Sequence, residues 1–124
     1  MRAVSPVLLV SDVVRSRDYY SDALGFRLNT LWGEPPTFCM ARRDGVEVML
    51  SQVSDNPQPN GKIDGQMDAY IWVDDVTNLF KEFDAKGALI ESGPTDRPYE
   101  AREIEVRDPD GHRLVFAQDM AGKA

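Results

Sequence analysis

The sequence is poor in cysteine and histidine, and it has no long hydrophobic run. The single Cys39 cannot close a disulfide within the chain, so nothing implies an oxidising compartment. No apolar stretch approaches the ~20 residues of a membrane span. Asp12 and Arg15 interrupt the first apolar stretch, and no cleavable leader pattern follows Met1. We therefore expect a cytoplasmic protein that does not associate with membranes.

Basic residues are scarce relative to acidic ones. The chain has 14 Lys and Arg against 21 Asp and Glu, which gives a formal net charge of -7. Nucleic acid is a poor partner for such a chain, because phosphate binding needs clustered Lys and Arg. The acidic surface favours solubility first, and the attraction of cationic ligands only second.

Recognisable catalytic motifs are missing as well. Ser5, Ser11 and Ser51 have no histidine near them in the sequence, and no glycine-rich phosphate loop occurs. Cys39 lies between two hydrophobic residues, where a free cysteine usually acts as a small hydrophobe. The sequence therefore offers no nucleophile with an adjacent base.

What the chain does contain is an internal repeat. VSDV at positions 10–13 returns as VDDV at 73–76, and DG at 44–45 with a Gln seven residues on returns at 110–111. Two copies of a unit of about 60 residues fit neither a solenoid nor a propeller. At 124 residues the chain is one domain's worth of protein. The repeat therefore predicts one domain, residues 1–124, built from two copies of a module.

Hydrophobic periodicity and turn residues give each copy the order β-α-β-β-β. Residues 76–83 carry apolar side chains at helical spacing, and Gly87 ends the pattern. The expected strands are 4–10, 26–31, 37–41 and 46–52 in the first copy, and 68–73, 88–91, 101–107 and 113–118 in the second. Residues 54–61 are nearly all turn formers, which predicts a linker at 54–66 between modules 4–53 and 67–118. We predict an α+β fold in which two βαβββ modules form a curved mixed sheet around a trough, with the helices on the outer face.

Alternation along the strands assigns side chains to this trough. Tyr70 and Trp72 face it from the first strand of the second module, and Trp32 could close its rim. Aromatic walls suit planar ligands, and a few polar groups then fix their orientation. Plain core packing is the alternative for both tryptophans. The expected ligand-binding residues are Trp72, Tyr70, Asp68, Glu47, Met49, Trp32 and Glu103.

These segments carry a family resemblance. Residues 7–13, 19–26 and 73–76, and above all 102–111 with 115–116, resemble vicinal-oxygen-chelate domains. That superfamily includes glyoxalase I, extradiol dioxygenases and bleomycin-resistance proteins, and residues 4–118 are most similar to bleomycin-resistance-type members. The resemblance implies the trough, together with four metal-ligand positions that are normally His, Gln or Glu.

The implied metal positions hold unsuitable residues in this chain. Carried over from the family motif, they are Ser5, Met49, Asp68 and Val115. Only Asp68 is a good ligand for zinc, iron or manganese, and the single His112, which follows a turn, is not expected to bind metal. A magnesium site stays open at Glu47, Asp68 and Glu103, with simple solvation as the favoured alternative. We therefore expect no metal and no cofactor.

The resemblance and the trough lining together favour a binding protein over an enzyme. The predicted function is metal-independent sequestration of an aromatic or cationic small molecule, with antibiotic resistance as one use. The resemblance also implies a homodimer, in which relatives pair modules between subunits. The alternative is a lyase, isomerase or dioxygenase-like enzyme with an atypical metal or a carboxylate site.

Overall fold

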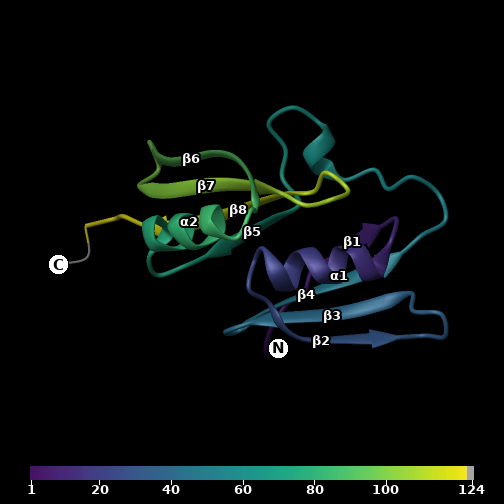
Figure 1. Ribbon diagram of the computed structural model, residues 1–124. Helices are drawn as coiled ribbons and strands as arrows, with labels where there is room; N and C mark the ends of the chain where they lie inside the picture. Colours follow the sequence, from purple (N-terminus) through teal and green to yellow (C-terminus); the bar gives the residue numbers. More distant parts are fainter. Residues whose placement is uncertain (123–124) are drawn as a thin grey trace.

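The computed structural model describes residues 1–122, which fold as two βαβββ modules joined by a linker (Figure 1). The first module comprises β1 (Val7–Val10), α1 (Val13–Asp22), β2 (Arg27–Trp32), β3 (Phe38–Arg43) and β4 (Val46–Gln52). The second module comprises β5 (Ala69–Trp72), α2 (Val76–Ala85), β6 (Leu89–Arg97), β7 (Ala101–Arg107) and β8 (Arg113–Asp119). A short 3-10 turn, η1 (Asn60–Lys62), lies in the linker. Within residues 1–122 no helix is long and apolar enough to cross a membrane.

Each module forms its own four-stranded sheet, in the orders β1-β4-β3-β2 and β5-β8-β7-β6. The first strand of each module runs parallel to the last, and the other pairs are antiparallel. The prediction of an α+β fold with two βαβββ modules is confirmed. Strand β6 is longer than expected, because shifts in its register with β7 let it continue past the turn formers Gly93 and Pro94.

The internal repeat has a structural explanation at the start of each helix. Asp12 caps α1 and Asp75 caps α2, each accepting a hydrogen bond from the amide three residues on, at 3.1 and 3.0 Å. Gln52 and Gln118 lie on the last strand of each module, and their side-chain oxygens accept from the first helical amide at 2.9 and 3.0 Å. These bonds satisfy amides that a helix start leaves unpaired. They also fix the start of α1 at Val13.

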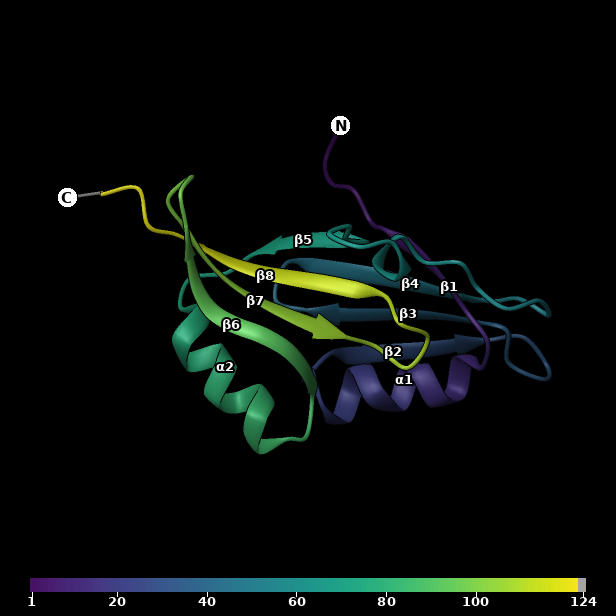
Figure 2. The same cartoon turned by 90° about the horizontal axis from the view of Figure 1, so that it is seen from above.

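Both helices pack on the same side of the sheets (Figure 2). The strand residues that alternate toward α1 are buried, namely Leu8, Val10, Cys39, Ala41, Val48 and Leu50. Those that alternate toward α2 are Ile71, Ile104, Val106, Leu114 and Phe116. Phe83 of α2 meets Phe116 edge to face, with ring centroids 5.1 Å apart. We call the opposite surface of each sheet its helix-free face.

The two modules meet through α1 and the turn between β7 and β8. The buried Tyr20 donates a hydrogen bond to Asp108 at 2.9 Å, and the same carboxylate oxygen lies 2.7 Å from Nδ1 of the buried His112. Tyr19 donates to the carbonyl of Arg107 at 2.6 Å. Burial, and then the charge of Asp108, raise the pKa of Tyr20 well above its ordinary value, so its hydroxyl stays protonated. The only histidine of the chain therefore belongs to a buried joint between the modules.

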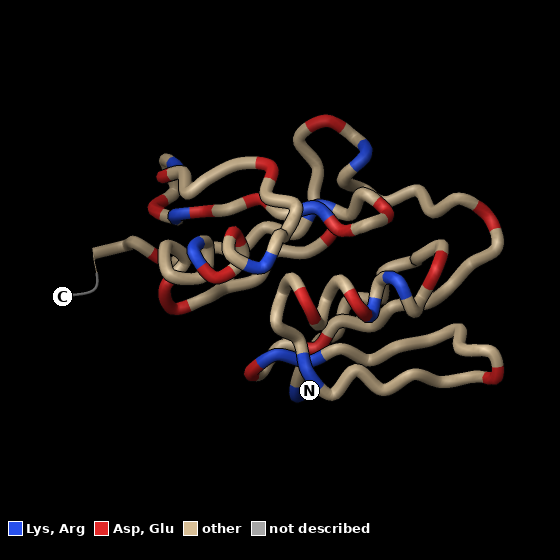
Figure 3. The backbone as a smooth tube through the Cα atoms, viewed as in Figure 1, with Lys and Arg blue, Asp and Glu red and all other residues tan. Residues whose placement is uncertain are grey.

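Acidic and basic residues are interspersed along both modules (Figure 3). Several pair between neighbouring strands, among them Arg42 with Glu47 and Arg102 with Asp96. Such exposed pairs contribute little to stability, typically about 0–1 kcal/mol each. Charged residues of both signs therefore occur along the whole described chain.

Candidate ligand-binding site

The helix-free face of the second sheet carries an exposed aromatic pair. Tyr70 and Trp72 lie two residues apart on β5, so both side chains point to the same face. Their rings meet edge to face, with centroids 5.1 Å apart. Trp72 is 60% exposed, so it does not pack in the core, whereas Ile71 between them is buried. The exposed indole is a flat apolar surface on which a planar ligand can stack.

A buried carboxylate lies beside this pair. Glu103 on β7 is only 4% exposed. The hydroxyls of Tyr70 and Tyr99 each donate to its Oε2 at 2.6 Å, and Arg97 Nε donates to its Oε1 at 3.0 Å. Burial opposes ionisation, but these three hydrogen bonds outweigh it and lower the pKa of Glu103 below its ordinary value. Glu103 is therefore an ionised carboxylate held in one position.

Glu103 in turn fixes the protonation of the two tyrosines. Burial, followed by the hydrogen bond to Glu103, raises the pKa of Tyr70. The same hydrogen bond, followed by burial, raises the pKa of Tyr99. Both phenols therefore keep their protons and donate to Glu103, while each phenol oxygen retains acceptor capacity for a ligand. This face thus combines the aromatic rings with the phenol oxygens as hydrogen-bond acceptors. They surround the negative charge of Glu103, which Arg97 already balances.

The helix-free face of the first sheet is more apolar. Val7 and Leu9 of β1 are exposed, and Met49 on β4 lies in register with Val7. Trp32 ends β2 and is 55% exposed. These four side chains form a half-surface of the kind that the predicted trough requires.

Glu47 is the carboxylate on this first face. It accepts a hydrogen bond from the Ser5 hydroxyl at 2.9 Å and another from Arg42 Nε. The bond from Arg42, followed by that from Ser5, lowers the pKa of Glu47. Glu47 is therefore ionised, and it is paired within its own module.

Asp68 lies immediately before β5, and its carboxylate accepts hydrogen bonds from backbone amides. Its Oδ1 accepts from the Asn60 amide at 2.7 Å, and its Oδ2 accepts from the amides of Gly61 and Arg113, both at 2.9 Å. The carboxylate thereby fastens η1 of the linker to the first residue of β8. Three such hydrogen bonds leave little capacity for a ligand.

The seven predicted site residues fall into three places in the fold. Tyr70, Trp72 and Glu103 meet on the second sheet, whereas Glu47, Met49 and Trp32 lie on the first sheet and Asp68 lies at the base of β5. No three His, Cys, Asp or Glu side chains of residues 1–122 come together as a metal site. The carboxylates left open as a magnesium site therefore do not converge.

The family's metal positions do not fit a metal in this chain either. Ser5 is bonded to Glu47, Asp68 is committed to backbone amides, and Val115 is buried and has no ligand atom. Met49 offers only a thioether, which suits soft metals. No chemical step can be derived through a metal at these positions.

The sequence missed two members of the Glu103 cluster. Arg97 is the last residue of β6, and Tyr99 lies in the turn that follows. Thr95 pairs with Glu103 across the β6–β7 hairpin, so Arg97 reaches the carboxylate from the neighbouring strand and Tyr99 reaches it from the turn that follows. In the sequence, Tyr99 lies four residues before Glu103, and this spacing alone does not predict a contact. The register of the β6–β7 hairpin is what brings the two side chains together.

Comparison with known proteins agrees with this architecture. Residues 2–116 match the model of the Glyoxalase/Bleomycin resistance protein/Dioxygenase superfamily. The chain belongs to this superfamily. The uncharacterized protein YraH of Bacillus subtilis (strain 168) is 26% identical over 131 residues, which cover 97% of this chain and 99% of YraH.

Two solved structures illustrate the likeness in fold. The bleomycin-binding protein from bleomycin-producing Streptomyces verticillus, complexed with copper(II)-bleomycin, gives a TM-score of 0.72 at 24% identity, covering 94% of each chain. A glyoxalase-related enzyme from Clostridium phytofermentans gives a TM-score of 0.78 at 16% identity, covering 96% of this chain and 95% of that one. The superfamily membership confirms the resemblance seen in the sequence. The fold is shared by a binder and by a protein described as an enzyme, so the function must be argued from the site.

Proposed function

We propose that the protein binds and sequesters a small aromatic or cationic molecule, without metal and without chemical turnover, in the manner of bleomycin-resistance-type members. The observation that carries this proposal is the exposed indole of Trp72 beside Tyr70 and the ionised Glu103. Stacking on an exposed ring is strong for planar ligands. No nucleophile with an adjacent base lies in this cluster.

The polar groups of the cluster define the ligand further. Arg97 already balances Glu103, so a ligand cation would add to an existing ion pair rather than meet a bare charge. A planar ring on Trp72 with a hydrogen-bond donor directed at the phenol oxygens of Tyr70 and Tyr99 fits the arrangement best. Planar antibiotics that carry amine or amide donors are one such class.

A homodimer is part of the same proposal. Each helix-free face is half of a trough, and both faces leave large apolar side chains exposed, including Val7, Leu9, Trp32 and Trp72. A second copy that lays its first sheet opposite this second sheet would bring Met49, Glu47 and Trp32 toward the ligand. We also propose a cytoplasmic location, where such a binder would intercept an antibiotic before it reaches its target.

Calorimetric titration with metal-free bleomycin and with other planar antibiotics, in the presence of a chelator, tests the proposal. Replacing Trp72→Ala should weaken binding roughly tenfold or more, because a stacking surface is lost. Ile63→Ala is the matched control, since Ile63 is an equally exposed apolar residue of the linker. Unchanged affinity of the Trp72 variant would argue against the site, and turnover that depends on stoichiometric metal would favour the enzyme alternative. Light scattering of the purified protein tests the dimer separately.

A further inference from the structure

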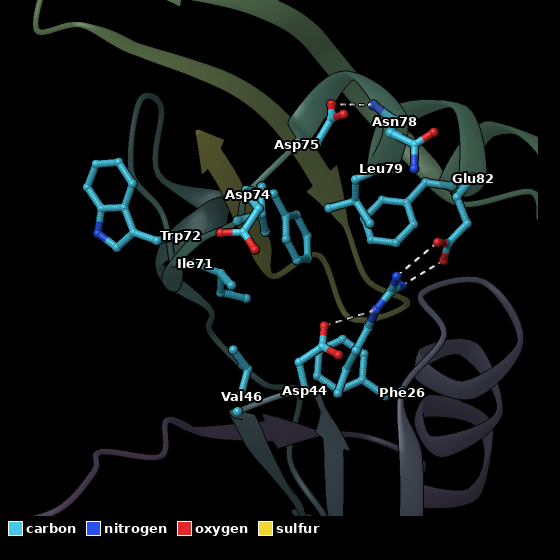
Figure 4. A pocket seen from close by; sticks show the side chains of 15 residues that line it. Phe26, Asp44, Val46, Ile71, Trp72, Asp74, Asp75, Asn78, Leu79 and Glu82 are labelled. Atoms are coloured by element: carbon cyan, nitrogen blue, oxygen red, sulfur yellow. Dashed lines mark hydrogen bonds and ion pairs between the residues drawn. The ribbon is translucent and has the colours of Figure 1, made fainter. Parts of the chain in front are cut away.

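A cavity of about 350 Å³ lies in the cleft between the two modules, beside α2 and apart from the Glu103 cluster (Figure 4). Its floor is apolar and is built from both modules. The floor residues are Phe26 of the first module and Ile71, Leu79, Phe83 and Phe116 of the second. A cavity of this size lies within the range of small-molecule sites, and its aromatic floor suits a ring or a branched alkyl group.

The mouth of this cleft is acidic on both sides. Asp44 reaches it from the turn between β3 and β4, and Asp74 reaches it from the loop between β5 and α2 (Figure 4). Within residues 1–122 the carboxylate of Asp74 has no hydrogen bond or ion pair. The side chain of Asp44 is 91% exposed, and its one ion pair with the described residues is to Arg43 Nε at 3.9 Å. Among residues 1–122, Asp74 thus stands at the entrance without a cationic partner, and Asp44 has only the long ion pair to Arg43.

The one basic residue of the lining is already neutralised. Arg43 donates to both oxygens of Glu82, at 2.6 and 2.9 Å, and to the carbonyl of Leu24 at 2.9 Å. The lining holds Asp44, Asp74, Asp75 and Glu82 against this single arginine, so its net charge is four negative less one positive, or -3. A cationic occupant is therefore favoured by the lining as a whole.

The positive end of the α2 dipole also faces this cleft, and it would favour an anion. That end is already capped. Asp75 accepts from the Asn78 amide, and Gln118 accepts from the Val76 amide. Two amides of the first turn of α2 therefore already have acceptors, and the four carboxylates of the lining outweigh the remaining positive end of the helix.

We propose that this cleft is a second binding site, which takes a small organic cation with an aromatic or branched apolar body. The apolar body rests on Phe26, Leu79 and Phe116, and the cationic group lies between Asp44 and Asp74. This inference goes beyond the proposed function, because the cavity is lined mainly by other residues and shares with the proposed ligand site only Trp72.

Methyl NMR of the intact protein, titrated with benzylammonium, tests the proposal. Shifts that saturate should appear at the methyl groups of Val46, Ile71 and Leu79, which line the cleft. Benzyl alcohol, which is neutral and of the same size, should bind at least several-fold more weakly. Shifts confined to Val7, Leu9 and Met49 would place the probe on the helix-free face of the first sheet and would overturn the proposal.

Charge variants give a second, independent readout. Asp44→Asn and Asp74→Asn should each raise the Kd for benzylammonium about two- to fivefold, the range of an exposed ion pair, and their combination about tenfold. The pair Asp55→Asn and Asp84→Asn removes the same charge from exposed positions outside the cleft and should change the Kd less than twofold. Equal effects of the two double variants would mean that only overall charge matters, and that outcome contradicts a site.

Discussion

Replacing Glu103→Gln is the most direct test of the cluster that defines the proposed site. The substitution keeps the shape of the side chain but removes the negative charge to which Tyr70, Tyr99 and Arg97 donate hydrogen bonds. Hydrogen bonds to a charged group contribute about 1.5–3 kcal/mol each, against about 0.5–1.5 kcal/mol for neutral ones. Relief from burying a charge offsets part of this loss. We expect a net decrease of about 2 kcal/mol in the free energy of unfolding at pH 7.

The pH dependence identifies the charge as the cause. The pKa of Glu103 in the folded protein lies below its value in the unfolded chain, which is about 4.3 for an unperturbed Glu. Its contribution to stability is therefore fully present above that unfolded value and is lost as the pH falls through the folded one. The difference between the wild type and Glu103→Gln should accordingly be largest at pH 5–7 and should shrink toward pH 3. Urea denaturation at pH 7, 5 and 3 measures it.

Glu105→Gln is the matched control on the same strand and the same face. Glu105 accepts one hydrogen bond from Ser92, at 3.0 Å, and lies 3.7 Å from Arg97. We expect this variant to lose less than about 1 kcal/mol, because its bonds are fewer and longer. A Glu103→Gln deficit that stays the same from pH 7 to pH 3 would refute the reasoning, since packing rather than charge would then explain it.

Three further substitutions, with one control, use urea denaturation to test contacts between the modules and around the linker. Tyr20→Phe removes the hydrogen bond to the buried Asp108 and should cost about 1–3 kcal/mol. Gly61→Ala should cost at least about 2 kcal/mol, because its Cβ would lie 2.5 Å from a backbone nitrogen of β8, whereas Gly45→Ala has nothing within 4 Å and should be nearly neutral. Asp68→Asn should cost about 2 kcal/mol and speed amide exchange in η1, since one of its oxygens becomes a donor that faces backbone amides. If Asp68→Asn is as stable as the wild type, the hydrogen bonds to Asp68 do not hold the linker in place, and its carboxylate would be free to bind a ligand.

The local signals in the sequence were sufficient for the fold. The repeated Asp-Val and Gln positions recur because each module caps its helix with the same two side chains, at Asp12 and Gln52 and again at Asp75 and Gln118. Strand alternation correctly placed Tyr70 and Trp72 opposite the buried Ile71. Capping and alternation involve neighbours in the chain or in one module, so a single sequence can reveal them.

The site depended on contacts that the sequence does not encode locally. Strand alternation predicted the face of the sheet on which Trp72 lies. It did not predict that Trp72 is exposed, because exposure depends on what covers that face. Asp68 read as a trough carboxylate, yet the linker folds back so that its backbone amides occupy both oxygens. Tyr99 joined the cluster only through the register of the β6–β7 hairpin.

The sequence by itself determined two βαβββ modules and, through the family resemblance, the presence of poor ligands at three of the family's four metal positions, namely Ser5, Met49 and Val115. Only the tertiary structure decided that Glu103 is the carboxylate with three donors, and that an acidic cleft with an aromatic floor opens between the modules. The physical reason is range. Periodicity and capping act over a few residues, whereas the cluster and the cleft depend on how β6 registers with β7 and how Phe26 and Asp44 of one module meet α2 of the other.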